Sequence, residues 1–236
     1  MLVVNPDGPP TFTRIPEARP GDNVSETAFD VAIAPDGAAA VRGRSRVSGV
    51  AAPGYRRTYQ TETDRRTQLE QSFSHAFPGL EVRGVKVSDL SRIEDDVTME
   101  YELSVPRYAQ RDGAGLRFSP FGAAPGYTET YAPNSSRRFD LVIGDPSVTR
   151  FTHRCALPAG WSVTDLPESA RGEGPFGGFE VRYRRDGTTL VAEGFVTLAT
   201  GRVAARDYPA FRAFVGEVDR ALTRKVRIAP AGEATR

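Results

Sequence analysis

The stretch from residue 179 to residue 228 places the strongest constraint on how this chain can fold. Two segments of alternating apolar and polar residues, 179–185 and 188–198, flank an Asp186-Gly187 pair. Asp-Gly is preferred in tight hairpin turns whose central residues both adopt positive φ, so we predict a β-hairpin here. A linker, a helix and a short final strand follow. We therefore expect a sheet that contains this hairpin and is covered by the helix.

The helix predicted at 207–223 has a single apolar stripe. Its large apolar residues recur at intervals of three and four, at Tyr208, Phe211, Val215, Val218 and Leu222. This spacing gathers the side chains on one helix face, which indicates that the helix packs on a sheet. Asp207 is a suitable N-cap for the first-turn amides, and Pro209 falls where a missing N–H costs little.

The remainder of the chain is rich in strand signals. β-branched residues and alternation predict strands at 26–33, 38–47, 80–87, 97–105, 139–143, 148–156 and 161–164. One further helix is expected near 55–77, where Pro78-Gly79 ends the helical pattern. We therefore predict a mainly β, α+β protein of two sandwich-like modules, residues 1–135 and 136–236. Each module has one helix packed on or beside it.

A candidate internal repeat in the sequence is consistent with two modules. Phe29-Asp30-Val31 precedes Asp36-Gly37 at the same spacing at which Phe179-Glu180-Val181 precedes Asp186-Gly187. A duplicated unit would explain the match, and chance recurrence of a common strand–turn–strand pattern is the alternative.

The charge balance and the apolar runs bear on which partners the chain can have. Lys and Arg total 31 against 30 Asp and Glu, so the net charge of +1 gives no field that would attract nucleic acid. Nearly all the positive charge is arginine, which we interpret as the coding bias of a GC-rich genome and not as an arginine patch. No apolar run approaches the length of a membrane span. The first residues lack the charged and apolar regions of a signal peptide. We expect neither nucleic-acid binding nor membrane insertion.

The glycines at 172–177 fit the G-x-G-x-x-G pattern of a dinucleotide site. That site needs a strand before the glycines and a helix N-terminus after them, where amides meet the pyrophosphate. Here the Leu166-Pro167 turn precedes them and a predicted strand follows. We predict a flexible loop that binds no nucleotide.

His153 and Cys155 bring an imidazole and a thiol together. Residues two apart on a strand share a face, so the pair is a candidate for an autonomous cysteine-dependent enzyme. Such an enzyme also needs an orienting acid and an oxyanion hole, which this segment does not supply. The expectation we favour is a buried structural cysteine beside a partly exposed histidine.

The remaining polar clusters suggest no bound group. Two histidines and one cysteine are too few for a zinc site. The acidic run 94–96, together with Glu100 and Glu102, lacks the spacing of a calcium loop. We expect a solvated turn and strand face. The sequence therefore assigns no catalytic, cofactor-binding or metal-binding residue, and we predict that this chain is not itself an enzyme.

The segment 107–133 is predicted to be mostly loop, yet it is unusually aromatic. Its aromatic residues are Tyr108, Phe118, Phe121, Tyr127 and Tyr131. We expect the segment to fold back over the edge of a core. The alternative is an exposed aromatic platform that binds carbohydrate or peptide.

Taken together, the segments of this chain resemble the C-terminal region of large bacterial transglutaminase-like proteins. Those proteins join an N-terminal β-sandwich of unknown function, a papain-like transglutaminase core and C-terminal β modules. The matching features are Leu2-Val3-Val4-Asn5-Pro6-Asp7-Gly8, Arg14-Ile15-Pro16, the Asn23 strand, the Asp36-Gly37 hairpin ending in Gly49, Phe77-Pro78-Gly79-Leu80, Leu157-Pro158-Ala159-Gly160-Trp161, Leu166-Pro167 and Asp207-Tyr208-Pro209-x-Phe211.

The resemblance implies a role without catalysis for this chain. The family's catalytic Cys, His and Asp lie upstream in the core, and no segment here matches them, so Cys155 is not assigned that role. The resemblance implies a structural or binding region that supports the transglutaminase-like core or contacts another protein. Because such proteins are often exported, it also implies a periplasmic or exported location.

Overall fold

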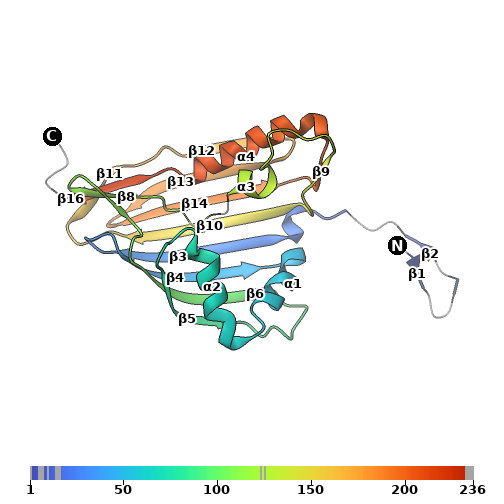
Figure 1. Cartoon of the computed structure of the whole chain (residues 1–236), viewed down its shortest axis with the longest axis horizontal. Coiled ribbons are helices and arrows are strands. Elements are labelled where there is room, and N and C mark those ends of the chain that lie inside the picture. The colour runs from blue at the N-terminus through green and yellow to red at the C-terminus, as the bar shows by residue number, and fades with distance from the viewer. Residues whose placement is uncertain are drawn as a thin grey trace.

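The structure is a computed structural model that describes residues 2–4, 8–9, 11–13, 17–122, 124 and 126–231. Its main feature is a sheet of eight strands with helices over one face (Figure 1). In spatial order the strands are β12 (Ala170–Gly174), β13 (Gly177–Asp186), β14 (Thr189–Leu198), β10 (Ser147–Ala156), β3 (Val24–Ile33), β4 (Ala39–Val47), β6 (Val97–Val105) and β5 (Glu81–Val87). The mainly β, α+β class is confirmed.

Both halves of the chain contribute four strands to this one sheet. The strands β3, β4, β5 and β6 come from residues 1–135, and β10, β12, β13 and β14 come from residues 136–236. The halves meet where β3 and β10 pair in parallel, from Val24–Val148 to Ala32–Ala156, while the other pairs of this sheet are antiparallel.

The two halves thus share a sheet where the sequence suggested two separate sandwich-like modules. Each half alone would leave a long central strand with unpaired N–H and C=O groups, and β3 and β10 satisfy each other. Buried Asn23 reinforces this junction. Its side-chain amide donates to the Pro146 carbonyl at 2.8 Å, and its side-chain carbonyl accepts from the Val50 N–H at 2.9 Å. The division at residue 135 stays a prediction.

The hairpin predicted around Asp186-Gly187 is confirmed as β13 and β14. Asp186 is paired with Thr189, so the two central residues of the turn are Gly187 and Thr188. Only Gly187 has positive φ, at 59°. The expectation that both Asp186 and Gly187 adopt positive φ is therefore wrong. A turn with glycine first and one positive φ is type II′, which also matches the twist of the strands.

The helix expected near 55–77 is two helices. α1 (Ala52–Thr58) and α2 (Arg65–Ser74) are separated by a break in which the Arg65 side chain donates to the Tyr59 carbonyl at 2.8 Å. Thr58, Thr61 and Thr63 lie at the break, and β-branched residues such as threonine have a low helix propensity. The first half of the chain therefore has two helices on its strands where one was expected.

The C-terminal helix α4 (Tyr208–Leu222) covers the other half of the sheet, as predicted. All five stripe residues are buried, and Ala221 joins them. The Asp207 side chain makes no capping hydrogen bond, so its predicted role is wrong. The backbone of Asp207 is already helical, in a 3-10 turn that precedes the helix, which removes the extended geometry that an N-cap side chain needs.

The aromatic segment 107–133 contains more regular structure than the sequence indicates. It forms β7 (Gln110–Asp112), β8 (Gly115–Phe118) and α3 (Tyr127–Tyr131). A four-stranded sheet joins β7 and β8 to β16 (Val226–Pro230) and β11 (Trp161–Asp165) in the order β11-β16-β8-β7. The last predicted strand therefore lies in this smaller sheet. Two further pairs are β1 (Leu2–Val3) with β2 (Thr11–Phe12), and β9 (Leu141–Val142) with β15 (Arg202–Val203).

Two clusters of buried side chains lie on the covered face of the eight-stranded sheet. The first core cluster packs under α1, α2 and the smaller sheet and includes Phe29, Leu69 and Ile228. The second core cluster packs under α3 and α4 and includes Phe121, Phe151 and Phe211. The parallel junction of β3 and β10 runs between them.

Candidate functional site

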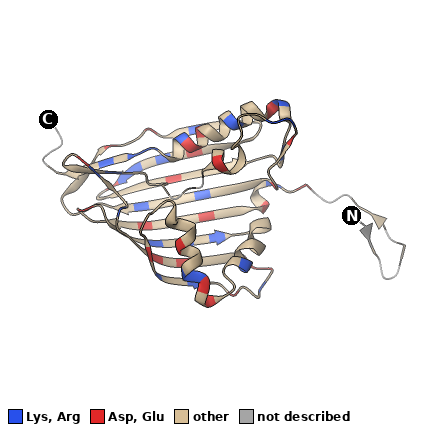
Figure 2. Ribbon diagram, viewed as in Figure 1, with Lys and Arg blue, Asp and Glu red and all other residues tan. Residues whose placement is uncertain are grey.

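The face of the eight-stranded sheet that the helices do not cover has mostly polar and charged side chains. The alternation along β4 illustrates this: Ala39, Val41 and Val47 are buried, and Arg42, Arg44 and Arg46 are exposed. β6 behaves likewise, with Thr98, Glu100 and Glu102 exposed. We call this surface the open face. Both signs of charge are interspersed over the strands (Figure 2).

The charges of the open face alternate in sign across neighbouring strands. One row consists of Arg46, Glu26 and Arg150, on β4, β3 and β10. A second row consists of Lys86, Glu100 and Arg44, on β5, β6 and β4. A third row consists of Glu102, Arg42, Asp30 and Arg154. Opposite charges directly across a strand pair stabilise a sheet, which explains why this face can stay in solvent.

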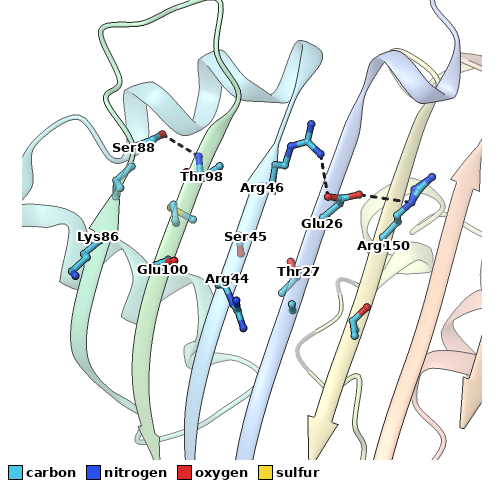
Figure 3. A pocket seen from close by; sticks show the side chains of 14 residues that line it. Glu26, Thr27, Arg44, Ser45, Arg46, Lys86, Ser88, Thr98, Glu100 and Arg150 are labelled. Carbon is cyan, nitrogen blue, oxygen red and sulfur yellow. Dashed lines mark hydrogen bonds and ion pairs between the residues drawn. The ribbon is translucent and has the colours of Figure 1, made fainter. Parts of the chain in front are cut away.

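The first row lies at one side of a shallow hollow of about 700 Å³ (Figure 3). Glu26 is between two arginines, 3.4 Å from the Arg46 guanidinium and 3.8 Å from that of Arg150. Arg46 also reaches Asp96 at 2.7 Å, and this hydrogen bond raises the pKa of the guanidinium further. Lys86 borders the hollow on its far side. The lining therefore has four cations against two carboxylates, Glu26 and Glu100.

A second hollow of about 660 Å³ lies farther along the same strands. Its lining includes Asp30, Arg42, Glu102 and Arg154. Arg42 is 3.4 Å from Glu102, and Arg44 is 3.0 Å from Asp30. These ion pairs are well exposed, and such pairs contribute little to stability. Each hollow therefore presents charged side chains of both signs to solvent.

The sequence contained a signal for this surface that our interpretation missed. Arg42, Arg44 and Arg46 recur at intervals of two, and residues two apart on a strand share a face. Attributing the arginines to coding bias hid this pattern. The expected solvated strand face at Glu100 and Glu102 is confirmed, and those two residues are the acidic partners in the rows.

The candidate thiol–imidazole pair is buried on the opposite face of the sheet. Cys155 is fully buried, with Sγ 3.8 Å from the Tyr108 hydroxyl, and burial raises the pKa of its thiol to about 12. A nucleophile needs the thiolate, which this environment disfavours. His153 is 1 % exposed, so the expectation of a partly exposed histidine is wrong. The ring is covered by Pro120 and Phe121, which are distant in sequence, so the pattern around His153 alone does not indicate its burial.

The aromatic segment folds back over the core, as predicted. Tyr108, Phe118, Phe121 and Tyr127 are all buried. The alternative of an exposed aromatic platform in 107–133 requires these rings at the surface, and these four rings are buried.

The glycines at 172–177 do not form a flexible loop. They form the end of an antiparallel hairpin, in which β12 and β13 pair from Ala170–Val181 to Gly174–Gly177. Gly172 and Gly174 lie within β12 and Gly177 begins β13, so this segment places no helix N-terminus beside the glycines. Absence of nucleotide binding stays a prediction.

Two absences apply to the described residues, 2–4, 8–9, 11–13, 17–122, 124 and 126–231. Within them, no group of three or more His, Cys, Asp or Glu side chains is arranged to hold a metal ion. No described helix is both long enough and apolar enough to cross a membrane.

The fold defines a class: an α+β module with one large mixed sheet, a covered face and an open charged face. A family model described as a domain of unknown function with a solved structure, DUF3858, matches residues 117–228, from β8 to β16. Among solved structures, the chain is similar to a crystal structure from Parabacteroides distasonis ATCC 8503 described as a "putative protease". Identity is 16 %, the TM-score is 0.38, and the match covers 42 % of this chain. This chain spans 20 % of that protein's length. No curated protein matches.

Proposed function

We propose that this chain is a non-catalytic β module of a larger transglutaminase-like protein, and that its open face receives the transglutaminase-like core. The observation that carries the proposal is the open face itself. The helices and the smaller sheet cover one side of the eight-stranded sheet, and the other side presents two charged hollows to solvent.

The chemistry of the open face suits protein contact better than catalysis. The five arginines of its rows each form an ion pair with a carboxylate, and among the described residues of this face no group stands out as a poised acid, base or nucleophile. A surface of paired, exposed charges forms wet, salt-sensitive interfaces in which charge complementarity sets orientation and association rate. The thiol that an enzymatic role would use is buried on the other side of the sheet. Support for the core as the partner comes from the resemblance of the chain to the C-terminal modules.

The experiment reads the coding sequence upstream of Met1 for a transglutaminase-like core and measures its association with this chain by isothermal titration calorimetry. We expect binding that weakens with salt and that falls roughly tenfold or more in the double variant Arg46→Glu/Arg150→Glu, because both changes place like charge beside Glu26. Each replaced guanidinium is exposed, so the double variant should still fold, and its melting temperature measures the cost of losing the two ion pairs with Glu26.

The control is Arg212→Glu, which makes the same charge change on the solvent side of α4, on the covered side of the sheet. It should bind like the parent. Absence of a core upstream, or equal binding by the double variant and the parent, would reject the proposal.

A further inference from the structure

A cavity of about 340 Å³ lies on the covered face, where the two core clusters meet. Its boundaries come from α1, α2, the strands β3, β4, β6 and β10, and Ala124 in the connection before α3. In Figure 1, α1 and α2 lie over one half of the sheet and α3 and α4 over the other. The cavity is thus a product of the junction between the two halves.

The floor of the cavity breaks the binary pattern of the sheet. Most residues on the covered face are apolar, yet Ser25, Thr27, Ser45 and Thr149 lie together here on three adjacent strands. All four are only partly buried, so the floor is in contact with solvent. A cluster of hydroxyls at positions where packing favours apolar side chains is a local conflict, and such conflicts concentrate at functional sites.

The hydroxyls are positioned by their neighbours. Tyr101 reaches from β6 across β4, and its hydroxyl is 3.0 Å from that of Ser45. Gly43 makes this possible, because a Cβ at that position would collide with the Tyr101 ring. Among the described residues, no hydrogen-bond partner is found for the side-chain hydroxyls of Ser25 and Thr27, which are therefore available to a ligand.

His153 lines the same cavity with an uncharged ring. Its Nδ1 contacts the Pro120 carbonyl, which can only accept, so Nδ1 carries the proton and Nε2 has a free lone pair. Nε2 is buried and has no partner among the described residues. Burial lowers the pKa of the ring to about 4, so the imidazole is neutral at pH 7. Because Nε2 is covered by its neighbours, the ring contributes a neutral wall to the cavity and leaves the hydrogen bonding to the hydroxyls.

The walls limit the ligand further. Phe73, Phe151, Leu69 and the ring of Tyr55 supply apolar surface, and none of the described residues lining the cavity is Lys, Arg, Asp or Glu. A charged ligand would be buried without a counter-ion, which is costly. The volume lies at the lower end of the range for small-molecule sites, so one ring is the size that fits.

We propose that this cavity binds a single neutral sugar ring or cyclic polyol, with its hydroxyls on Ser25 and Thr27 and its apolar face against the aromatic walls. The site is separate from the open face and does not depend on the function proposed for that surface.

The test uses the whole chain labelled with ¹³C at its methionine methyl groups. Met99 lines the cavity, and Met1 is the only other methionine, so the label contains its own control. D-glucose, N-acetyl-D-glucosamine and myo-inositol are titrated, and calorimetry gives the affinity. At least one of them should shift the Met99 signal and not that of Met1, with a Kd of about 1 mM or tighter.

Variants then separate specific binding from general effects. Thr27→Val keeps the side-chain shape and removes the hydroxyl, and it should weaken binding roughly tenfold, the cost of one well-made hydrogen bond. Thr152→Val makes the same change on the exposed side of β10 and should stay within about twofold of the parent. Melting temperatures confirm that both variants fold.

Glucose 6-phosphate and phenol test the two chemical limits. The phosphate should bind at least tenfold more weakly than glucose, since no cation lines the cavity. Failure of all three polyols to bind by about 10 mM would overturn the proposal. Equal binding by Thr27→Val and the parent would do the same, as would tighter binding of phenol than of any polyol.

Discussion

His153 lies between the two core clusters and contacts both. Its ring stacks on Phe29 of the first cluster with centroids 4.6 Å apart, and it is 5.2 Å from Phe121 of the second. The imidazole is therefore packed against aromatic rings, and among the described residues its only hydrogen-bond partner is the Pro120 carbonyl. This environment tolerates the neutral ring and penalises the imidazolium.

The burial of His153 makes stability depend on pH. Its pKa falls from an ordinary value of 6.5 to about 4, so between these values the unfolded chain binds a proton that the folded chain does not. Stability is full above pH 6.5 and falls as the pH is lowered toward 4. The total loss from this residue is on the order of 3 kcal/mol. Urea unfolding at a series of pH values measures it.

Two variants decide whether His153 is responsible. His153→Gln should flatten the part of the profile between pH 4 and 6.5, whatever its effect on absolute stability. His75→Gln changes the only other histidine, which is exposed, and should leave the profile as it is. An unchanged slope in His153→Gln would show that other groups cause the pH dependence.

The sequence predicts on which face of the sheet the His153 side chain lies, but not which residues surround it. Strand alternation places His153 and Cys155 on one face, and the structure agrees. Whether that face is covered depends on Pro120 and Phe121, which lie more than thirty residues away and have no local signal for the contact. The hydroxyls of the cavity were missed for the same reason, because Ser25, Ser45 and Thr149 become neighbours only through strand pairing.

At the scale of elements, strong local signals gave correct predictions. The β13–β14 hairpin follows from alternation and an Asp-Gly pair, and α4 follows from its apolar stripe. The helix near 55–77 was less well predicted because α2 has only a weak apolar stripe, with Leu69 as its one buried residue. The segment 172–177 was wrongly predicted to be a loop because its glycines have no side chains, so the alternation of apolar and polar residues that indicates a strand is missing there.

The packing of α4 can be tested at Phe211. This side chain is fully buried in the second core cluster, 5.4 Å from the Phe176 ring between centroids. Phe211→Ala should destabilise the protein by about 3–5 kcal/mol, the cost of lost apolar burial and of the cavity that remains. Gly216 weakens the helix by roughly 1 kcal/mol relative to alanine, so packing has to hold it.

The neighbouring Arg212→Ala is the control for Phe211→Ala. Its side chain is exposed on the same turn, and its effect should stay within about 0.5 kcal/mol. Chemical denaturation measures both variants. A loss below about 1 kcal/mol in Phe211→Ala would mean that α4 is not held by its apolar face.

At the scale of the whole molecule, the two halves are tied together by contacts distant in sequence. β3 pairs with β10 along its length, and β8 pairs with β16, so each half completes a sheet with strands of the other. The first core cluster includes Cys155, Leu190 and Ile228 from the second half. No pattern within a short window can predict a parallel pairing across more than 120 residues, which is why the sequence suggested separate modules.

This arrangement predicts one cooperative unfolding transition. Trp161, the only tryptophan, is in β11 and packs against the first core cluster, so its fluorescence reports on the smaller sheet. Far-UV circular dichroism reports mainly on the large sheet and the helices. The two signals should give coincident urea midpoints if the halves unfold together. Two resolved midpoints would instead support modules that fold separately at residue 135.

The ends of the large sheet explain why it stops at eight strands. β5 has an irregularity between Val82 and Gly84, and it carries Arg83 and Lys86 on an otherwise unpaired rim. β12, at the other rim, is only five residues long and contains two glycines. A bulge, charged side chains and a short strand each hinder the docking of a further strand. The molecule can therefore keep one broad face open without growing into a fibre by the addition of strands, because that growth needs free N–H and C=O groups along an unobstructed rim.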